Sequence, residues 1–250
     1  KNQESRIKNY GFALLAFIFT SSALLLKPFA VFFLLPMGWL VLRYQSWKGF
    51  LSWKLWLFAI FSLAPLAWWR IWMMQYPEGI PSNLWLLNKG NIRFTGAYFY
   101  WIFARRISEL ILGWWGIAIV MLGVLQTGLK AYGFFISFVV SSLLYLIIIA
   151  RGNVQHDYYQ ILILPTIALL FGLGTDFLLN KLTMVNKTAR YAFLIITSLF
   201  ILSFGWFQIR DYFNINNRNI VIAGQAVDRL VPKDAKVIAP YDGDTSFLYQ

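Results

Sequence analysis

The sequence predicts an all-α polytopic membrane protein with about seven transmembrane helices, followed by the start of a small extracytoplasmic α/β domain. Hydrophobic residues make up 59% of the 250 residues and charged residues only 13%, a balance that a soluble fold of this size does not have. The apolar residues gather in runs of about 20, the length that crosses a bilayer as a helix. The alternation of apolar and polar residues that is typical of a membrane β-barrel is absent.

The expected spans follow one another through residues 1–210, which form the predicted transmembrane region. The second run is short for a full crossing, so we expect it to be tilted or flanked by interfacial tryptophans. The segment "TGAYFYWIFARRISELI" predicts an amphipathic helix that lies in the membrane interface before the fourth span. The runs are Gly11–Leu26, Pro28–Leu42, Leu55–Met74, Leu110–Gln126, Ala131–Ala150, Ile161–Leu179 and Ala192–Ile209.

Lysine and arginine are concentrated in alternate short loops, and this pattern predicts the orientation in the cytoplasmic (inner) membrane. Positive residues in short loops favour the cytoplasm, so the loops richest in them are expected inside. These are Lys1–Asn9, Arg43–Lys54, the turn at Lys130 and Asn180–Arg190. The segments expected on the extracytoplasmic face are the turn at Lys27, Gln75–Glu109, Arg151–Gln160 and the tail after Arg210. The net charge of +12 comes largely from lysines and arginines in these loops, where they are expected to meet anionic lipid headgroups. No nucleic-acid partner is expected.

Residues 211–250 are predicted to begin a soluble extracytoplasmic domain. "IVIAGQAVDRLV" has a helical period, and "PKDAKVIAPYDGD" predicts a turn, a short strand and another turn. The chain begins without a methionine or a signal peptide and ends directly after the predicted strand. We therefore expect it to be a fragment of a longer protein.

The composition also restricts the chemistry. The chain has no cysteine and one histidine, which excludes disulfides, thiolate sites and multi-histidine metal sites. No cofactor is evident, and a divalent metal held only by carboxylates stays open. The motifs GxxxxGK[ST], GxSxG and HExxH are absent. The "GLG" at Gly172–Gly174 predicts close helix packing rather than a dinucleotide loop.

Lys27 is the first candidate site residue on the predicted outer face. It stands directly before Pro28, between two apolar runs. In one interpretation it is a snorkelling turn residue, and Pro28 begins the next helix at its first position. In the other it holds the phosphate of a lipid carrier as a flexible point charge.

The stretch "RGNVQHDYYQ" holds the only histidine, His156, followed by Asp157, Tyr158 and Tyr159. A structural interpretation has Asp157 capping the next helix, the tyrosines in the aromatic belt and His156 in solvent. In a functional interpretation His156 donates to phosphate or sugar hydroxyls, and Asp157 accepts from hydroxyls or serves as a general base. We favour the functional role for His156, since a concentrated polar stretch on an apolar scaffold indicates function.

Arg105 and Arg106 form the third candidate. They are either interfacial anchors or a clamp on a phosphate or pyrophosphate leaving group. Adjacent residues of a helix point about 100° apart, so only one of the two is expected to face a site.

Three stretches carry a family resemblance in this order: "SSALLLKPFAVFFLLP", "HDYYQILILPTIALLFGLG" and "AGQAVDRLVPKDAKVIAPYDGD". Together they resemble the C-terminal two-thirds of a C-class membrane glycosyltransferase. More narrowly, they are similar to the bacterial branch of the dolichyl-phosphate-mannose–protein mannosyltransferase superfamily, which includes the lipid A aminoarabinose transferases. The resemblance implies an enzyme that moves a sugar from a polyprenyl-phosphate carrier to an acceptor on the outer face. The acceptor would be lipid A, a glycan or a protein.

The resemblance also implies roles for individual residues. Lys27 matches the family's lysine before an apolar run and a proline, here Pro36, and would contact the carrier phosphate. His156, Tyr158 and Tyr159 would line the donor pocket. Arg105 and Arg106 have no firm counterpart, and Asp157 varies in the family, so its catalytic role is not fixed. The family's catalytic acids lie in the first outer loop, and no outer acid here matches them, so the catalytic acid is expected before Lys1.

Two other function classes are weighed against the enzyme. A non-catalytic scaffold or a lipid-handling or transport protein of envelope assembly would share the same helices, and paired acids in an upstream outer loop would favour the enzyme instead. A transporter or channel requires ionisable residues at mid-membrane depth in several spans. Arg70 and Asp176 lie near predicted span ends, which argues against that class.

Overall fold

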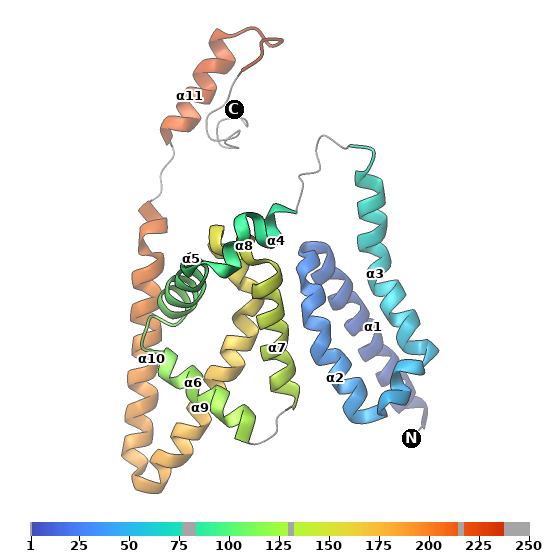
Figure 1. Ribbon diagram of the computed structural model, residues 1–250, viewed down its shortest axis with the longest axis vertical. Helices are drawn as coiled ribbons and strands as arrows, with labels where there is room; N and C mark the ends of the chain where they lie inside the picture. The colour runs from blue at the N-terminus through green and yellow to red at the C-terminus, as the bar shows by residue number, and fades with distance from the viewer. Residues whose placement is uncertain (1, 77–83, 130–132, 215–217, 238–250) are drawn as a thin grey trace. The chain divides into compact units, whose positions relative to one another are not determined.

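The computed structural model describes residues 2–76, 84–129, 133–214 and 218–237. Within these ranges every regular element is a helix and none is a strand (Figure 1). The all-α class is therefore confirmed for the part of the chain that is described. The α/β character expected after residue 210 gains no support, because residues 232–237 form no strand and the rest of the predicted strand region lies outside the described residues.

Four helical segments in the described ranges are long and apolar enough to cross a membrane: Pro28–Gln45, Trp53–Met73, Asp157–Leu182 and Lys187–Ile209. Three further apolar helices are shorter: Tyr10–Leu26, Ile117–Thr127 and Gly133–Ile148. These lengths fit a membrane protein. They do not by themselves support the predicted number of about seven crossings.

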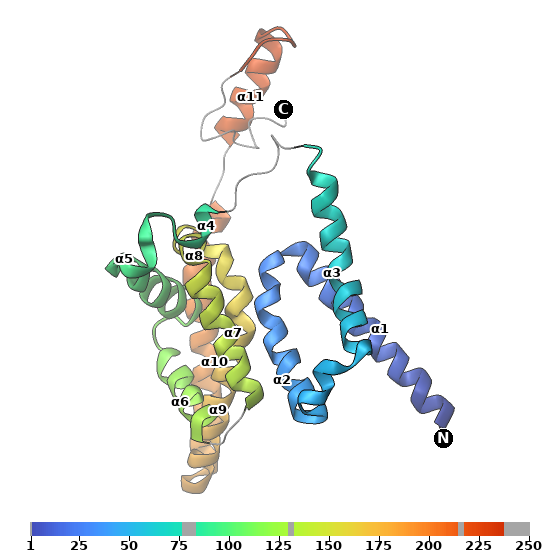
Figure 2. The ribbon, with the colours of Figure 1, turned by 45° about the vertical axis from the view of Figure 1, so that its right-hand side comes forward.

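The first part of the chain folds as three apolar helices with short connections (Figure 2). Lys27 is the break after the first helix: its backbone is extended (φ −149°, ψ 105°), and Pro28 starts the next element, where its missing N–H costs nothing. The hydroxyl of Ser21 donates to the carbonyl of Ser62 across 3.3 Å, which joins the first helix to the third. The elements are α1 (Asn2–Leu26), η1 (Pro28–Phe33), α2 (Leu34–Gln45), η2 (Trp47–Leu51) and α3 (Trp53–Met73).

The predicted amphipathic helix is present, while its place in the membrane interface stays a prediction, and the bounds of the span expected after it are partly wrong. The helix ends at Ile111, and α6 (Ile117–Leu129) begins only at Ile117 rather than within the predicted Leu110–Gln126. The chain turns sharply between them, where Gly113 (φ 55°) and Trp114 (φ 66°) take left-handed backbone angles. The elements before this turn are α4 (Trp85–Asn88), η4 (Lys89–Phe94), α5 (Gly96–Phe99) and the π-helix η5 (Tyr100–Ile111).

The stretch Arg151–Gln160, which the sequence suggests is a loop, is mostly helical. Helix α7 (Gly133–Ile148) is followed at once by α8 (Ala150–Gln155) and then by η6 (Asp157–Ile163). The loop prediction is wrong because apolar neighbours bury this stretch: Gly152, Asn153 and Val154 are all buried. α4, α5 and α8 lie at the same end of α7 (Figures 1 and 2). The main hydrophobic core sits there, around Tyr145, Ile102 and Ile163.

Two glycines allow α6 and α9 (Leu164–Val185) to pack in close contact. A Cβ on Gly123 would lie 1.9 Å from the Leu170 carbonyl oxygen, and one on Gly174 would lie 1.9 Å from the Ile119 carbonyl oxygen. Small residues at such crossings let membrane helices approach backbone to backbone. The predicted packing role of the "GLG" is therefore confirmed for Gly174, while a Cβ on Gly172 would meet nothing within 4 Å.

The chain divides into two compact units, Lys1–Ile201 and Leu202–Gln250. The division falls inside α10 (Lys187–Ile209), and the domain boundary predicted after residue 210 stays a prediction. Within the second unit, η7 (Arg210–Asn214) precedes α11 (Arg218–Leu230). The latter is the helix predicted for "IVIAGQAVDRLV". All the candidate site residues lie in the first unit.

Candidate functional site

The ammonium of Lys27 lies over aromatic rings. Its nitrogen is 3.8 Å from the ring centroid of Tyr159, 5.1 Å from that of Tyr158 and 5.8 Å from that of Phe29. These are cation–π contacts, in which the negative face of a ring attracts a cation. No ion pair recorded among the described residues includes Lys27. The lysine is therefore held by ring faces rather than by a carboxylate.

The surroundings of Lys27 also affect its charge. The side chain is half-buried, and desolvation lowers the pKa of Lys27 below its ordinary value, since burial disfavours the charged form. A negatively charged ligand at this position would restore the stability of the ammonium. The site thus suits an anion that the protein does not itself provide.

His156 belongs to the same aromatic cluster. Its ring stacks on Tyr159 with centroids 5.6 Å apart and an interplanar angle of 22°, and it lies 5.2 Å from the ring of Tyr158. The ring of Trp85 meets it edge-on at 5.8 Å. His156 is the extended residue between α8 and η6 (φ −120°, ψ 126°). The fold therefore brings Lys27, His156, Tyr158 and Tyr159 together, although the lysine is far from the others in sequence.

A buried polar network fixes the start of η6. The hydroxyl of Tyr145 donates to the Tyr159 carbonyl oxygen at 3.1 Å. The Gln160 amide donates to the Asn153 carbonyl oxygen at 2.9 Å and to its side-chain oxygen at 3.1 Å. Tyr145, Asn153 and Gln160 are all almost completely buried, so these bonds are shielded from water. Sequence reasoning missed them, although polar residues at the end of an apolar run were the available signal.

The neighbouring arginines have different partners, as their helical spacing predicts. Arg106 lies 3.9 Å from the Asp157 carboxylate and 5.3 Å over the ring of Trp101. Its side chain is only 16% exposed, and its Nε is buried without a hydrogen-bond partner. Arg105 is 44% exposed and pairs with Glu109 one turn along η5. Arg106 thus adjoins the site through Asp157, and Arg105 does not.

Asp157 does not cap the following helix, contrary to the structural interpretation of the sequence. The capping position of η6 is His156, which makes no side-chain capping bond, and Asp157 is the first helical residue. Its carboxylate is 43% exposed and lies beside Arg106. The capping interpretation fails because the helix begins one residue earlier than that interpretation requires, at Asp157 itself.

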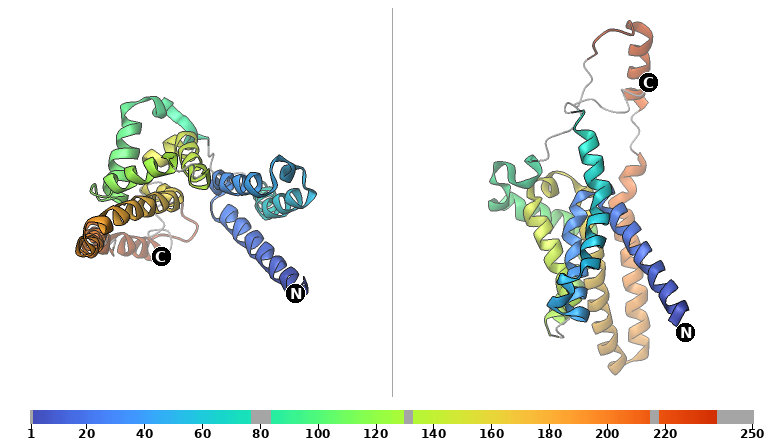
Figure 3. Two further views of the ribbon diagram at one scale, coloured as in Figure 1. Left: turned by 90° about the horizontal axis from the view of Figure 1, so that it is seen from below. Right: turned by 90° about the vertical axis from the view of Figure 1, so that its right-hand side faces the viewer.

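An apolar cavity of about 680 Å³ lies between α2 and α7, which pack side by side (Figure 3). Its wall on the α2 side runs from Val31 to Leu42, and its wall on the α7 side runs from Gly133 to Val140. Val31 lies in η1, four residues after Lys27 in the chain. The residues between these limits are almost all apolar, as a lipid chain would require.

Comparisons with protein-family models, with curated proteins and with solved structures found no match. Within the described ranges no group of three or more His, Asp or Glu side chains is placed to hold a metal ion.

Proposed function

We propose that this chain is the carrier-binding part of a membrane glycosyltransferase that uses a polyprenyl-phosphate-linked sugar as its donor. The observation that carries the proposal is the Lys27 ammonium, held 3.8 Å over Tyr159 without a carboxylate partner among the described residues. A lysine in this state has its hydrogen-bond donors available for a phosphate. The family resemblance of the surrounding sequence supports the same assignment.

The phosphate and sugar of the carrier would bind at the cluster of Lys27, His156, Tyr158 and Tyr159. A phosphate beside Lys27 would receive a charge-assisted hydrogen bond, which is about twice as strong as a neutral one. His156 lies in the same cluster and has a ring N–H that can donate to a phosphate or sugar oxygen. The ring faces of Tyr158 and Tyr159 offer flat apolar surfaces on which a sugar can lie.

The tail of the carrier fits the cavity between α2 and α7. A polyprenyl chain is entirely apolar, so it can replace bilayer lipid in an apolar cavity without burying an unpaired polar group. The lining of the cavity starts at Val31, four residues after Lys27 in the chain, and continues along α2 to Leu42. One molecule with a phosphate head and an apolar tail can therefore occupy both places.

The proposed reaction is a direct displacement at the anomeric carbon. A base removes the proton of the acceptor hydroxyl, the oxygen attacks the carbon, and the bond to the carrier phosphate breaks with inversion. Lys27 stabilises the negative charge that develops on the departing phosphate. Asp157 is a candidate base in this chain, and the resemblance favours an acid that precedes Lys1.

The membrane arrangement is part of the proposal. The four long helices and the three shorter apolar helices make seven crossings if the shorter ones also span the bilayer. The distribution of lysine and arginine then puts Lys27 and His156 on the extracytoplasmic face of the inner membrane. A soluble α/β domain follows on that face.

Carrier binding can be tested with a polyprenyl phosphate that bears a photoreactive group in its tail. With the chain in phosphatidylcholine nanodiscs, we expect saturable crosslinks to peptides of α2 and α7. Unlabelled polyprenyl phosphate should compete strongly, and the corresponding polyprenol, which lacks the phosphate, only weakly. Equal competition by the two would show that no phosphate is recognised and would overturn the proposal.

The enzymatic step needs a separate assay. The complete protein should transfer sugar from the labelled carrier, and its gene should encode paired acidic residues in an outer loop before Lys1. Carrier binding without transfer in the complete protein would instead assign a lipid-handling role.

A further inference from the structure

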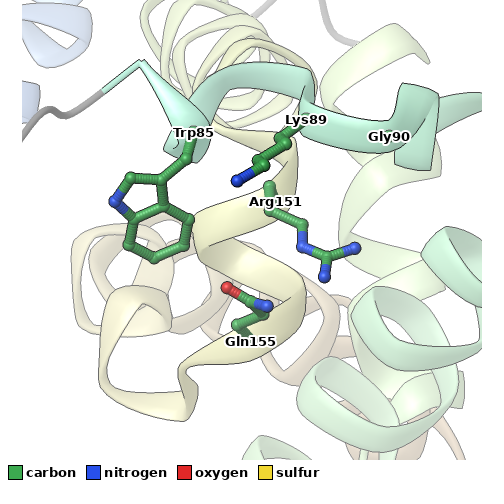
Figure 4. A pocket seen from close by; sticks show the side chains of 5 residues that line it. All are labelled: Trp85, Lys89, Gly90, Arg151 and Gln155. Atoms are coloured by element: carbon green, nitrogen blue, oxygen red, sulfur yellow. The ribbon is translucent and has the colours of Figure 1, made fainter. Parts of the chain in front are cut away.

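A second cavity, of about 400 Å³, lies next to the aromatic cluster and is lined by Trp85, Lys89, Gly90, Arg151 and Gln155 (Figure 4). Trp85 and Lys89 come from the segment of α4 and η4, and Arg151 and Gln155 come from α8. Among the residues that the structure describes, the lining contains two cationic side chains, an indole and an amide, and no carboxylate. Of these residues, only Trp85 makes a ring contact with the cluster of Lys27, His156, Tyr158 and Tyr159, through the edge of its ring against His156.

A tight turn positions Lys89. The next two residues, Gly90 (φ 74°) and Asn91 (φ 51°), are both left-handed, which favours glycine and asparagine. The side-chain oxygen of Asn88 accepts from the Arg93 N–H at 3.1 Å, and its amide donates to the Asn91 side chain at 3.3 Å. These bonds hold the backbone on both sides of Lys89, so the lysine is presented from an ordered turn.

α8 positions the other cation. Arg151 and Gln155 are four residues apart and therefore share one face of the helix. With the Gln155 amide oriented so that its oxygen faces the guanidinium, it accepts from Arg151 Nε at 3.1 Å and from Nη2 at 3.0 Å. A guanidinium has five N–H donors, so others remain for a ligand.

A glycine lets the two walls come close enough to form one cavity. A Cβ on Gly152 would lie 3.0 Å from Leu86 Cδ2 and 3.1 Å from Tyr159 Cε1. α4 therefore rests directly on α8, and Trp85, Lys89 and Arg151 line the same cavity. The indole of Trp85 separates this cavity from His156, whose ring it meets at 5.8 Å.

We infer that this cavity is a second anion site, which binds a phosphate monoester carried on a sugar. Two cations without a carboxylate suit a doubly charged group, which Lys89 binds as a point charge and Arg151 with its planar fork. The indole offers an apolar face to the sugar ring. The volume lies in the range of about 300–1,000 Å³ that small-molecule sites have.

The inference adds a second ligand to the proposed function. If the chain is a glycosyltransferase, this subsite holds a phosphorylated acceptor next to the donor. The role as an acceptor site rests on the proposed function, whereas the binding of a phosphate monoester does not. The phosphate monoester could belong to a soluble sugar phosphate or to the headgroup of a membrane lipid. Both carry the same chemistry, and the experiment separates them.

The test uses isothermal titration calorimetry of the chain in phosphatidylcholine nanodiscs, with glucose 1-phosphate as the probe. We expect saturable binding that glucose does not reproduce. Lys89→Gln and Arg151→Gln should each weaken it about tenfold or more, the expected effect of losing one charged hydrogen bond. The control variants Lys48→Gln and Lys54→Gln, at lysines outside both proposed sites, should leave the affinity unchanged.

Three outcomes would overturn the inference: no binding of glucose 1-phosphate by the wild type, equal binding of glucose, or an unchanged affinity in the Lys89→Gln, Arg151→Gln double variant. Unchanged helical circular dichroism shows that the variants remain folded. Nanodiscs that contain phosphatidic acid identify the source of the phosphate. If they suppress the titration in the wild type, the site takes a lipid headgroup; if they leave it intact, it takes a soluble sugar phosphate.

Discussion

The Lys27 ammonium and the Tyr159 ring, 3.8 Å apart, join the break after α1 to the start of η6. A cation–π contact contributes about 0.5–2 kcal/mol, depending on how far the pair is removed from water. Partial burial nevertheless disfavours the charged form and lowers the pKa of Lys27. The contact therefore positions the lysine without fully compensating its charge, and a phosphate can do so.

Replacing Lys27 tests the proposed phosphate contact. In the complete protein Lys27→Ala should reduce sugar transfer about tenfold to a hundredfold, because a charged hydrogen bond contributes about 1.5–3 kcal/mol. The thermal stability should change little, since no ion pair is lost. Lys54, which lies 5.9 Å over its neighbour Trp53, gives a matched control, and Lys54→Ala should transfer normally. Full activity in Lys27→Ala would contradict the phosphate role.

Carrier affinity should decrease at high pH because the pKa of Lys27 is lowered by burial. The ammonium is the form that attracts phosphate, so affinity is complete below the lowered pKa and falls as pH rises through it. The fall should therefore begin below the ordinary lysine pKa of 10.5. Bound phosphate raises the pKa again, so binding in this window should take up protons, which calorimetry in two buffers measures.

Two variants check that Lys27 is the group responsible. Lys27→Arg should show a flat pH profile, because arginine stays protonated. Tyr158 and Tyr159 face the ammonium and also carry ionisable hydroxyls, so a Tyr158→Phe, Tyr159→Phe double variant should keep the wild-type profile. If the pH dependence of carrier affinity persists in Lys27→Arg and disappears in the tyrosine double variant, the titrating group is a tyrosine rather than Lys27.

The adjacent arginines should differ in their effect on transfer. Arg106 packs beside Asp157 and Trp101, whereas Arg105 pairs with Glu109 on η5. Arg106→Ala should lower kcat/KM by about tenfold, since it removes a mostly buried cation next to the site. Arg105→Ala should stay within about twofold of the wild type, because exposed ion pairs contribute little. Equal losses would indicate that both act only as membrane anchors.

Cysteine labelling tests the orientation with no background, since the chain contains no cysteine. A cysteine at Gln155, which is exposed, should react with an impermeant maleimide in intact cells. One at Lys48, in the loop predicted to be cytoplasmic, should react only after permeabilisation. The reverse pattern would overturn the proposed topology and the extracytoplasmic site.

The crossing of α6 and α9 should tolerate one glycine replacement and not the other. Gly174→Ala puts a Cβ 1.9 Å from the Ile119 carbonyl oxygen and should destabilise the protein by about 1–3 kcal/mol. Gly172→Ala meets nothing within 4 Å and should be neutral or gain up to about 1 kcal/mol from helix propensity. Denaturant unfolding in detergent, followed by circular dichroism, compares them. Equal stabilities would show that the two helices are not in close contact.

Sequence reasoning could predict the Lys27 cluster because the charge pattern puts Lys27 and His156 on one membrane face. It could not predict the cavity between Lys89 and Arg151, which exists only because α4 rests on α8. The turn at Gly113 and Trp114 could not be predicted from the sequence either. Hydrophobic periodicity reports which residues are apolar, and it does not report where the backbone takes a left-handed angle.

The close crossing at Gly123 and Gly174 has a consequence for lipid traffic. Where the two backbones lie this close, no acyl or prenyl chain can pass between α6 and α9 at these residues. The apolar space of about 680 Å³ between α2 and α7 is, by contrast, open to its surroundings. If the proposed function holds, a carrier moving in the membrane plane would therefore approach the protein beside α2 rather than between α6 and α9.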